Sequence, residues 1–364
     1  MKIIAQAFTG GFNSPSFFSD KYTEKLISVI DGAGAESVII GWNTNAPYGR
    51  ITSLLHELGK KALLWLPVFS EYGGAAVPAV DFTGGMHAGA VSGAEDDFTF
   101  ACPCDPGNIR LAADYYDKYF SGCEFDGVFL DKIRFSTFGN GFKSGMGCFC
   151  ERCRDFYSHE NVDIDVFRSL MGNEKKDFLA PASRFGMRYT FEDKLIDRLY
   201  QARAKLITSS VKRASEMFRQ RGLDVGLDVF APPLAYLFGQ DIEALADCAG
   251  FIKPMLYRVT DAPAGIPYET GNLKKELMKN GCNALDSLEK LWDTAELTSE
   301  DCLIKQLKLL ANISCPTYCG VEVNKTAFCG TSKEYVETTI NAVKKAGIAG
   351  CVLSWNVLAE TVYP

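Results

Sequence analysis

The chain has 364 residues, more than the roughly 250 of a plain (β/α)8 barrel, so we expect one large domain with long insertions or two smaller domains. Apolar residues make up 47% and charged residues 23%, a balance that excludes a disordered or fibrous protein. The net charge of −7, with no lysine or arginine run beyond doublets, argues against nucleic acid as a partner.

The sequence carries no sign of a membrane or secreted protein. No apolar stretch approaches the ~20 residues that cross a bilayer, and the N-terminal apolar run reaches polar residues too soon for a signal peptide. Thirteen cysteines without a secretion signal are typical of a reducing compartment. We therefore expect a cytoplasmic protein with free thiols and no membrane contact. The sequence leaves its oligomeric state open.

Short β-branched and aromatic runs alternate with amphipathic stretches, a pattern typical of parallel strands joined by helices. The runs are apolar nearly throughout, as strands covered on both faces are. They predict eight strands over Lys2–Phe8, Glu36–Trp42, Lys61–Phe69, Gly127–Phe135, Val225–Ala231, Phe251–Arg258, Tyr318–Asn324 and Gly350–Asn356.

Helices are predicted between these strands, each followed by a glycine that can cap its last turn. No G-x-G-x-x-G follows a strand, so an open nucleotide-binding sheet lacks its best support. We predict one (β/α)8 TIM-barrel domain over residues 1–364, with the last helix truncated because the chain stops soon after strand eight. The clearest helices cover Thr23–Ile30, Ile51–Leu58, Asn108–Phe120, Phe191–Arg221 and Tyr335–Lys345.

Three connections are long, over residues 70–107, 136–190 and 259–298, after strands three, four and six. Each follows the C-terminal end of a strand, which is the catalytic face of such barrels. Structureless loops this long are seldom plain connectors. We expect these insertions to wall a cleft on the catalytic face.

Acidic side chains at strand ends form the predicted catalytic pair. Asp131 closes the apolar strand four, and Glu322 lies between two valines of strand seven, where a buried carboxylate is costly unless it faces a polar cavity. Glycoside hydrolysis needs such a pair, one carboxyl to protonate the leaving oxygen and one to attack the anomeric carbon or activate water. We expect Asp131 as acid/base, Glu322 as nucleophile, and Asp228 as a secondary acid that tunes pKa values or binds a hydroxyl.

Aromatic, amide and basic side chains gather at the same strand ends. Flat aromatic faces stack on sugar rings while amides bind hydroxyls. Core packing is the alternative for each aromatic residue, and it is the better interpretation for Trp65, which lies in mid-strand. The predicted substrate contacts are Trp42, Asn43, Lys132, Arg134, Asp228, Lys253, Tyr257, Asn324, Trp355 and Asn356.

The insertion after strand four contains a C-x-C-x-x-C cluster of Cys148, Cys150 and Cys153. Structural zinc takes four ligands, and Cys102 in the neighbouring insertion is a candidate for the fourth, with Cys104 as the alternative. Such a site would pin two insertions together. The competing interpretation is a set of reduced or partly disulfide-bonded thiols. We expect catalysis itself to need no cofactor.

The three histidines are scattered, which disfavours a His-rich metallohydrolase. His87 lies in a glycine-rich loop and is predicted to be exposed on the surface, with a substrate contact over the cleft as the alternative. His56 is predicted to be structural. The cysteines outside the cluster are predicted to be small core residues.

The segment Asp126–Phe135, followed by Cys148–Cys153, resembles the bacterial glycoside-hydrolase-like TIM-barrel proteins, in which a D-G-x-x-x-D-x-I-R strand precedes a C-x-C-x-x-C insertion. The resemblance implies the (β/α)8 fold and action on carbohydrate. Barrels of this kind also imply a cis peptide bond between Ser354 and Trp355. Retaining barrels of the best-known type have Asn-Glu where this chain has Leu130-Asp131, so both the acid/base and the nucleophile role stay open to Asp131. Further similar segments are Gly226–Pro232, Phe251–Tyr257 and Leu353–Asn356.

The sequence thus predicts a glycoside hydrolase with a carbohydrate substrate. A carbohydrate-binding barrel without catalysis is the alternative, because the same aromatic cleft would serve it. A metal-dependent hydrolase built on the cysteines is less favoured, since no histidine ligand set accompanies them.

Overall fold

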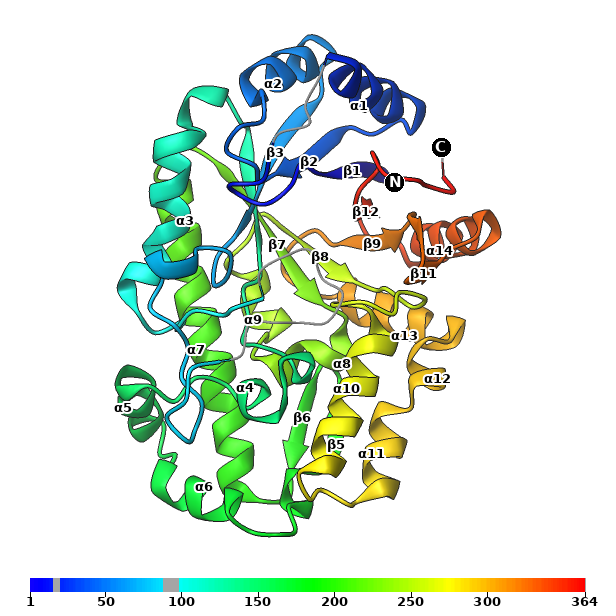
Figure 1. The fold of residues 1–364 in the computed structure, drawn as a ribbon. Coiled ribbons are helices and arrows are strands. Elements are labelled where there is room, and N and C mark those ends of the chain that lie inside the picture. Colours follow the sequence, from blue (N-terminus) through cyan, green and yellow to red (C-terminus); the bar gives the residue numbers. More distant parts are fainter. Residues whose placement is uncertain (16–19, 88–97, 364) are drawn as a thin grey trace.

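Eight parallel strands close into a barrel with the neighbour order β1-β12-β9-β8-β7-β4-β3-β2 (Figure 1). The structure is a computed structural model and describes residues 1–15, 20–87 and 98–363. It confirms the predicted (β/α)8 fold. The barrel strands are β1 (Lys2–Phe8), β2 (Ser37–Gly41), β3 (Lys61–Pro67), β4 (Gly127–Asp131), β7 (Asp224–Phe230), β8 (Phe251–Met255), β9 (Tyr318–Glu322) and β12 (Gly350–Ser354).

Several strands end earlier than predicted at their C-terminal ends. β4 stops at Asp131 because Lys132 takes a positive φ of 52°, which turns the backbone out of the extended region. Similarly, β8 stops at Met255, so that Tyr257 and Arg258 lie in the following loop. These loop residues form what we call the rim, at the C-terminal ends of the barrel strands.

Helices surround the barrel and connect its strands (Figure 1). The longest, α7, begins at Lys194, so the predicted start at Phe191 was wrong: Phe191 ends a short strand instead. Asp193 caps α7 by accepting from the backbone N–H groups of Leu195 and Ile196, which fixes this boundary. The main helices are α1 (Asp20–Gly32), α2 (Tyr48–Glu57), α3 (Pro106–Tyr119), α7 (Lys194–Arg219), α9 (Ile242–Ala246), α10 (Ile266–Lys279), α13 (Glu300–Leu310) and α14 (Lys333–Ala346).

The connection after β4 folds into its own small elements, which gather at one end of the molecule (Figure 1). Helices α11 and α12, in the connection after β8, lie in the same region, where Trp292 Nε1 donates to Tyr189 Oη over 2.9 Å. Two insertions from different strand ends therefore support each other. Their elements are α4 (Phe142–Gly145), α5 (Glu151–His159), α6 (Ile164–Met171), β5 (Pro181–Phe185), β6 (Arg188–Phe191), α11 (Leu285–Trp292) and α12 (Thr294–Leu297).

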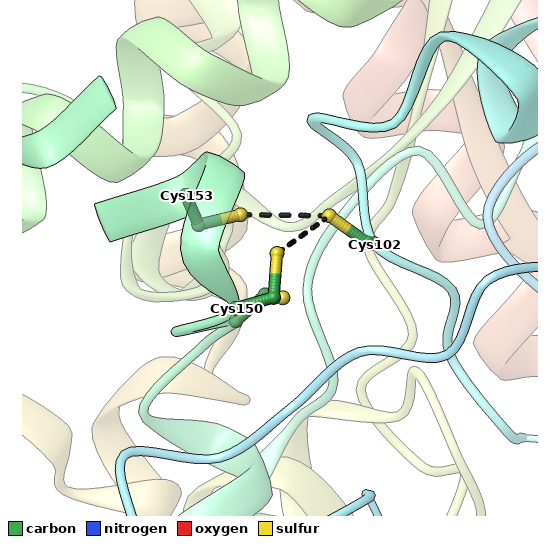
Figure 2. A group of neighbouring side chains, drawn as sticks. Cys102, Cys150 and Cys153 are labelled. Carbon is green, nitrogen blue, oxygen red and sulfur yellow. Dashed lines mark hydrogen bonds between the residues drawn. The ribbon is translucent and has the colours of Figure 1, made fainter. Parts of the chain in front are cut away.

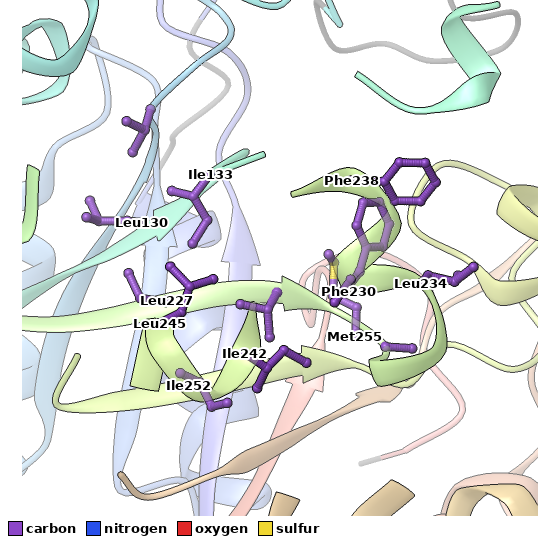
Figure 3. Packing of buried hydrophobic residues seen from close by; sticks show 14 of the residues in the cluster. Leu130, Ile133, Leu227, Phe230, Leu234, Phe238, Ile242, Leu245, Ile252 and Met255 are labelled. Atoms are coloured by element: carbon purple, nitrogen blue, oxygen red, sulfur yellow. The ribbon is translucent and has the colours of Figure 1, made fainter. Parts of the chain in front are cut away.

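The core continues from the strands into the helices outside them. Leu130, Leu227 and Ile252 of β4, β7 and β8 are buried beside Ile242 and Leu245 of α9 (Figure 3). Alternate positions on the same strands are left to face the barrel interior. This packing holds the ends of β4, β7 and β8, and so the rim residues that follow them, in a fixed frame.

Residues 355–363, which follow β12, contain no helix. A short hairpin of β10 (Lys325–Thr326) and β11 (Cys329–Gly330) follows β9, and α8 (Pro232–Ala235) follows β7. None of the helices within the described ranges combines the length and the apolar character needed to span a bilayer.

Candidate active site

Three charged side chains lie at neighbouring positions of β4, β7 and β8. The strand register pairs Leu130 with Leu227, so Asp131 and Asp228 occupy adjacent positions, and Asp228 is paired with Lys253. Asp131 is partly exposed, whereas Asp228 and Lys253 are only 2% and 1% exposed. Three of the predicted site residues, Asp131, Asp228 and Lys253, therefore occupy neighbouring strand positions.

The carboxylate of Asp131 is held from two sides. Its Oδ2 accepts from Trp65 Nε1 over 3.0 Å, and its Oδ1 accepts from the backbone N–H of Lys132. Trp65, predicted to be a core residue, is buried but also orients this acid. Fixed carboxylate geometry at a partly exposed rim position is what a reacting group requires.

Asp228 and Lys253 form a buried ion pair of 3.0 Å, and Lys253 Nζ also donates to Tyr257 Oη over 2.7 Å. Burial raises the pKa of Asp228 to about 7, because desolvation outweighs the attraction of the Lys253 ammonium and the charge of Asp131 acts in the same direction as burial. Burial opposes the ammonium form of Lys253, yet Asp228 and Tyr257 together raise its pKa. Asp228 Oδ1 has no hydrogen-bond partner among the described residues.

Gly320 of β9 makes room for the Lys253 side chain. A Cβ at this position would lie 2.9 Å from Lys253 Cε and 3.2 Å from Tyr257 Cε1. Any larger residue would therefore displace the lysine that reaches Asp228.

A second set of charges lies beside Asp131, and sequence reasoning missed its acidic members. Lys132 Nζ forms an ion pair with Glu71 and lies 4.3 Å from the ring centroid of Phe98. Arg134 is buried, and burial lowers its pKa, opposed by the nearby charges of Glu269, Asp131 and Asp228. Glu71 lies a few residues after the end of β3, as Lys132 lies after the end of β4. Its place near the C-terminal end of a barrel strand was the sequence signal that could have identified it.

Glu322 sits in a network of structural hydrogen bonds. Its Oε2 accepts from the backbone N–H of Arg258 over 2.9 Å and from the hydroxyl of Tyr335. Its Oε1 accepts from the backbone N–H of Val259 over 3.0 Å and from Thr260 Oγ1 over 2.6 Å. The side chain is 0% exposed, and protein donors occupy both oxygens. This arrangement ties the loop after β8 to β9 and α14.

The predicted amide contacts also have structural partners. Asn324 Oδ1 accepts from the backbone N–H groups of Trp355 and Asn356, over 3.0 and 3.1 Å. Asn43 is buried, and its Nδ2 donates to the backbone oxygen of Ser14. Both amides thus fix the turns that follow barrel strands.

The predicted aromatic contacts differ in exposure. Trp42 is buried edge-on against Phe8 and Trp65, and its Nε1 has no partner among the described residues. Trp355 is partly exposed and lies 6.3 Å from Tyr257, ring centroid to ring centroid. The peptide bond between Ser354 and Trp355 is cis, as predicted, and a second non-proline cis bond joins Gly41 and Trp42.

The cysteine cluster joins two insertions (Figure 2). The Sγ atoms of Cys102, Cys148, Cys150 and Cys153 lie within 4.8 Å of one another, so the fourth member is Cys102. Cys104 instead donates to the backbone oxygen of Arg152. Four thiols so placed could hold a metal ion.

The prediction that His87 is exposed was wrong. Its side chain is buried, with Nδ1 3.1 Å from Ser136 Oγ and Nε2 3.1 Å from the backbone oxygen of Gly147. Burial lowers its pKa to about 4. His87 therefore links the connections after β3 and β4. His56 bonds Asp126 over 3.0 Å at the opposite end of the barrel, consistent with the structural role predicted for it.

Comparison with known proteins supports the fold. No family model and no curated protein matches the chain. Solved structures with a similar fold include the glycoside hydrolase domain of PgaB (BpsB) from Bordetella bronchiseptica, with TM-score 0.59 and 12% identity over 98% of this chain and 95% of that one. The catalytic domain of β-amylase from Paenibacillus polymyxa has TM-score 0.53 and 11% identity, covering 99% and 95%. At these identities the likeness shows a shared (β/α)8 barrel fold and no more.

Proposed function

We propose that this chain hydrolyses glycosidic bonds and that the carboxyl groups of Asp131 and Asp228 are the reacting pair. The observation that carries the proposal is their adjacency on β4 and β7 in unlike surroundings. One is partly exposed and held by two N–H donors, and the other is buried with a pKa of about 7. Two carboxyl groups whose environments differ in this way are the arrangement that acid/base division of labour requires.

In this proposal the protonated Asp228 gives its proton to the leaving oxygen as the glycosidic C–O bond breaks. Asp131 attacks the anomeric carbon and forms a covalent glycosyl ester with it. Water then attacks the same carbon, the ester bond to Asp131 breaks, and a proton of that water passes to Asp228. Asp131 is written here as the nucleophile of a retaining reaction, for which a carboxyl separation of about 5–5.5 Å is typical, against about 6.5–9.5 Å for inversion. The Asp228 Oδ1 is buried and has no hydrogen-bond partner among the described residues, so no protein donor competes for the oxygen that would carry the proton.

The role of Glu322 as nucleophile stays a prediction, and its four protein donors favour a positioning role instead. A nucleophile must present a free oxygen to the anomeric carbon, whereas both oxygens of Glu322 are occupied. We keep Trp355 and Asn356, which are partly exposed, as the proposed substrate contacts closest to solvent. Behind these two lie the buried members of the predicted contact set, which would orient the groups that touch the substrate: Trp42, Lys132, Arg134, Lys253 and Tyr257.

A screen of aryl glycosides and oligosaccharides tests the proposal. Asp131→Asn and Asp228→Asn should each lower kcat at least 100-fold on a responsive substrate, within the range that acid–base groups contribute. Asp224→Asn, at the opposite and exposed end of β7, is the matched control and should retain activity. The opposite result would be a Glu322→Gln variant that is stable but inactive, together with an active Asp228→Asn variant. That result would favour the pair predicted from the sequence, Asp131 and Glu322. Sugar binding without hydrolysis by any form of the protein would favour the carbohydrate-binding alternative.

A further inference from the structure

We propose that Cys102, Cys148, Cys150 and Cys153 bind one structural zinc ion, with Arg203 as the buried countercharge of the site. The proposal is independent of the hydrolase function. Zinc coordinated tetrahedrally at about 2.3 Å from each sulfur gives sulfur–sulfur distances of about 3.8 Å. The separations from Cys102 Sγ to the sulfurs of Cys150 and Cys153 are 3.4 and 3.5 Å, and all four sulfurs fit within 4.8 Å (Figure 2).

The backbone around the cluster stabilises thiolates. Cys150 is the residue that precedes α5 and Cys153 lies in its first turn, where the positive end of the helix dipole favours negative charge. The backbone N–H of Val80 points to Cys148 Sγ over 3.4 Å. Three of the four cysteines are buried, so the site is shielded from water.

Arg203 supplies a second, independent observation. Its guanidinium is 0% exposed and forms no ion pair within residues 1–15, 20–87 and 98–363. Its Nη2 donates to the backbone oxygen of Gly145 over 3.1 Å, and its Nε and Nη1 have no hydrogen-bond partner among these residues. The guanidinium lies over the rings of Phe135 and Tyr200, at 5.1 and 4.6 Å from their centroids, and neither ring carries a countercharge. A buried cation without a countercharge is costly.

The missing countercharge is what the proposed site provides. Four thiolates and one Zn²⁺ carry a net charge of −2, and binding breaks four S–H bonds and releases four protons. Arg203 Nε lies 3.1 Å from where a Cβ of Gly147 would be, directly before Cys148. With four thiolates the zinc has no open position, so its role is structural.

The first experiment measures metal in protein purified with reductant and without chelator. We expect one zinc per chain by elemental analysis, and a tetrahedral thiolate spectrum when cobalt replaces zinc. Cys102→Ser should lose the metal, whereas Cys104→Ser, in the same loop but outside the cluster, should keep it. Equal loss in both variants would overturn the proposal. So would wild-type protein that holds no metal after incubation with zinc under reducing conditions.

A second measurement needs no variant of the cluster. With metal bound, the four thiols should resist alkylation and become reactive after chelation, as peptide mapping would show. A map in which chelation uncovers no cysteine, or in which the four are disulfide-bonded, contradicts the site.

For the countercharge, Arg203→Met should weaken zinc affinity by about 10- to 100-fold in chelator competition, as for other residues that support a metal site from outside. Arg203→Lys and the exposed Arg198→Met should change it less, and equal losses in all three would exclude Arg203 from this role.

Discussion

At the scale of single residues, the proton affinity of Asp228 decides what the rim can do. Its carboxyl is paired with Lys253, but burial still raises its pKa to about 7. Asp228 thus holds a proton below neutral pH and releases it above. The ammonium of Lys253 lowers the pKa of Asp228 and so limits the rise that burial causes.

The pH dependence of kcat/KM follows from this pairing. If protonated Asp228 is the acid, kcat/KM should fall as the pH rises through about 7. Lys253→Met removes a charge that lowers the pKa of Asp228. The fall of kcat/KM on the alkaline side, which we call the alkaline limb, should therefore move to higher pH. Lys253→Arg keeps the charge and should leave the limb near its original position. An unchanged profile in the methionine variant, measured on folded protein, would exclude Asp228 as the titrating group.

Residue identity alone predicted the strand-end acid Asp131 but misjudged the surroundings of Glu322 and His87. The sequence around an acid between two valines does not distinguish a cavity from four hydrogen-bond donors of the protein. Those donors come from loops and a helix that are distant in sequence. His87 looked exposed because its own loop is rich in glycine, whereas Ser136 and Gly147 bury it from another insertion.

At the scale of elements, side chains from one strand end fix the turn after the next. Asn324, after β9, binds two N–H groups after β12 and is fully buried. Asn324→Ala leaves both donors unmet and should lower the free energy of unfolding by about 2–3 kcal/mol, measured by urea denaturation. Asn312→Ala, at an exposed helix end, serves as the control and should cost less than half as much.

The contact of His87 with the connection after β4 should make stability sensitive to acid. Its pKa is about 4 in the folded chain and about 6.5 when unfolded, so the unfolded state binds the extra proton between these values. The stability contributed by neutral His87 is complete above about pH 6.5. It should be lost progressively toward pH 4, by about 3 kcal/mol in all.

His87→Gln, which cannot ionise, should flatten this part of the stability curve. Urea denaturation at several pH values from 4 to 7 provides the comparison. Parallel curves for the two proteins would show that His87 does not govern the acid response.

At the scale of the whole molecule, alternating apolar runs and helix-ending glycines were enough to predict the barrel and all eight of its strands, to within a few residues. Strand ends were less predictable because they depend on single backbone angles, such as the positive φ of Lys132. The spacing C-x-C-x-x-C identified three members of the cysteine cluster, but the choice of Cys102 over Cys104 required the packing of two insertions.

Metal removal should therefore act on the insertions rather than on the barrel. Chelation under reducing conditions should speed amide hydrogen exchange in residues 98–105 and 146–153, which carry the proposed ligands. Exchange in β4 and β7 should stay slow, because their hydrogen bonds belong to the closed sheet. Uniform acceleration across the chain would mean that the cluster supports the whole fold.

The space left by Gly320 has a consequence for how this rim can be altered. A methyl group there would meet Lys253 Cε and the backbone oxygen of Pro254, so Gly320→Ala changes no ionisable group but should shift the lysine that pairs with the buried acid. The acidity of the rim thus depends on the absence of a side chain at one position of a neighbouring strand. Steric substitution at one backbone position thus offers a way to retune the working pH of the protein without touching any ionisable group.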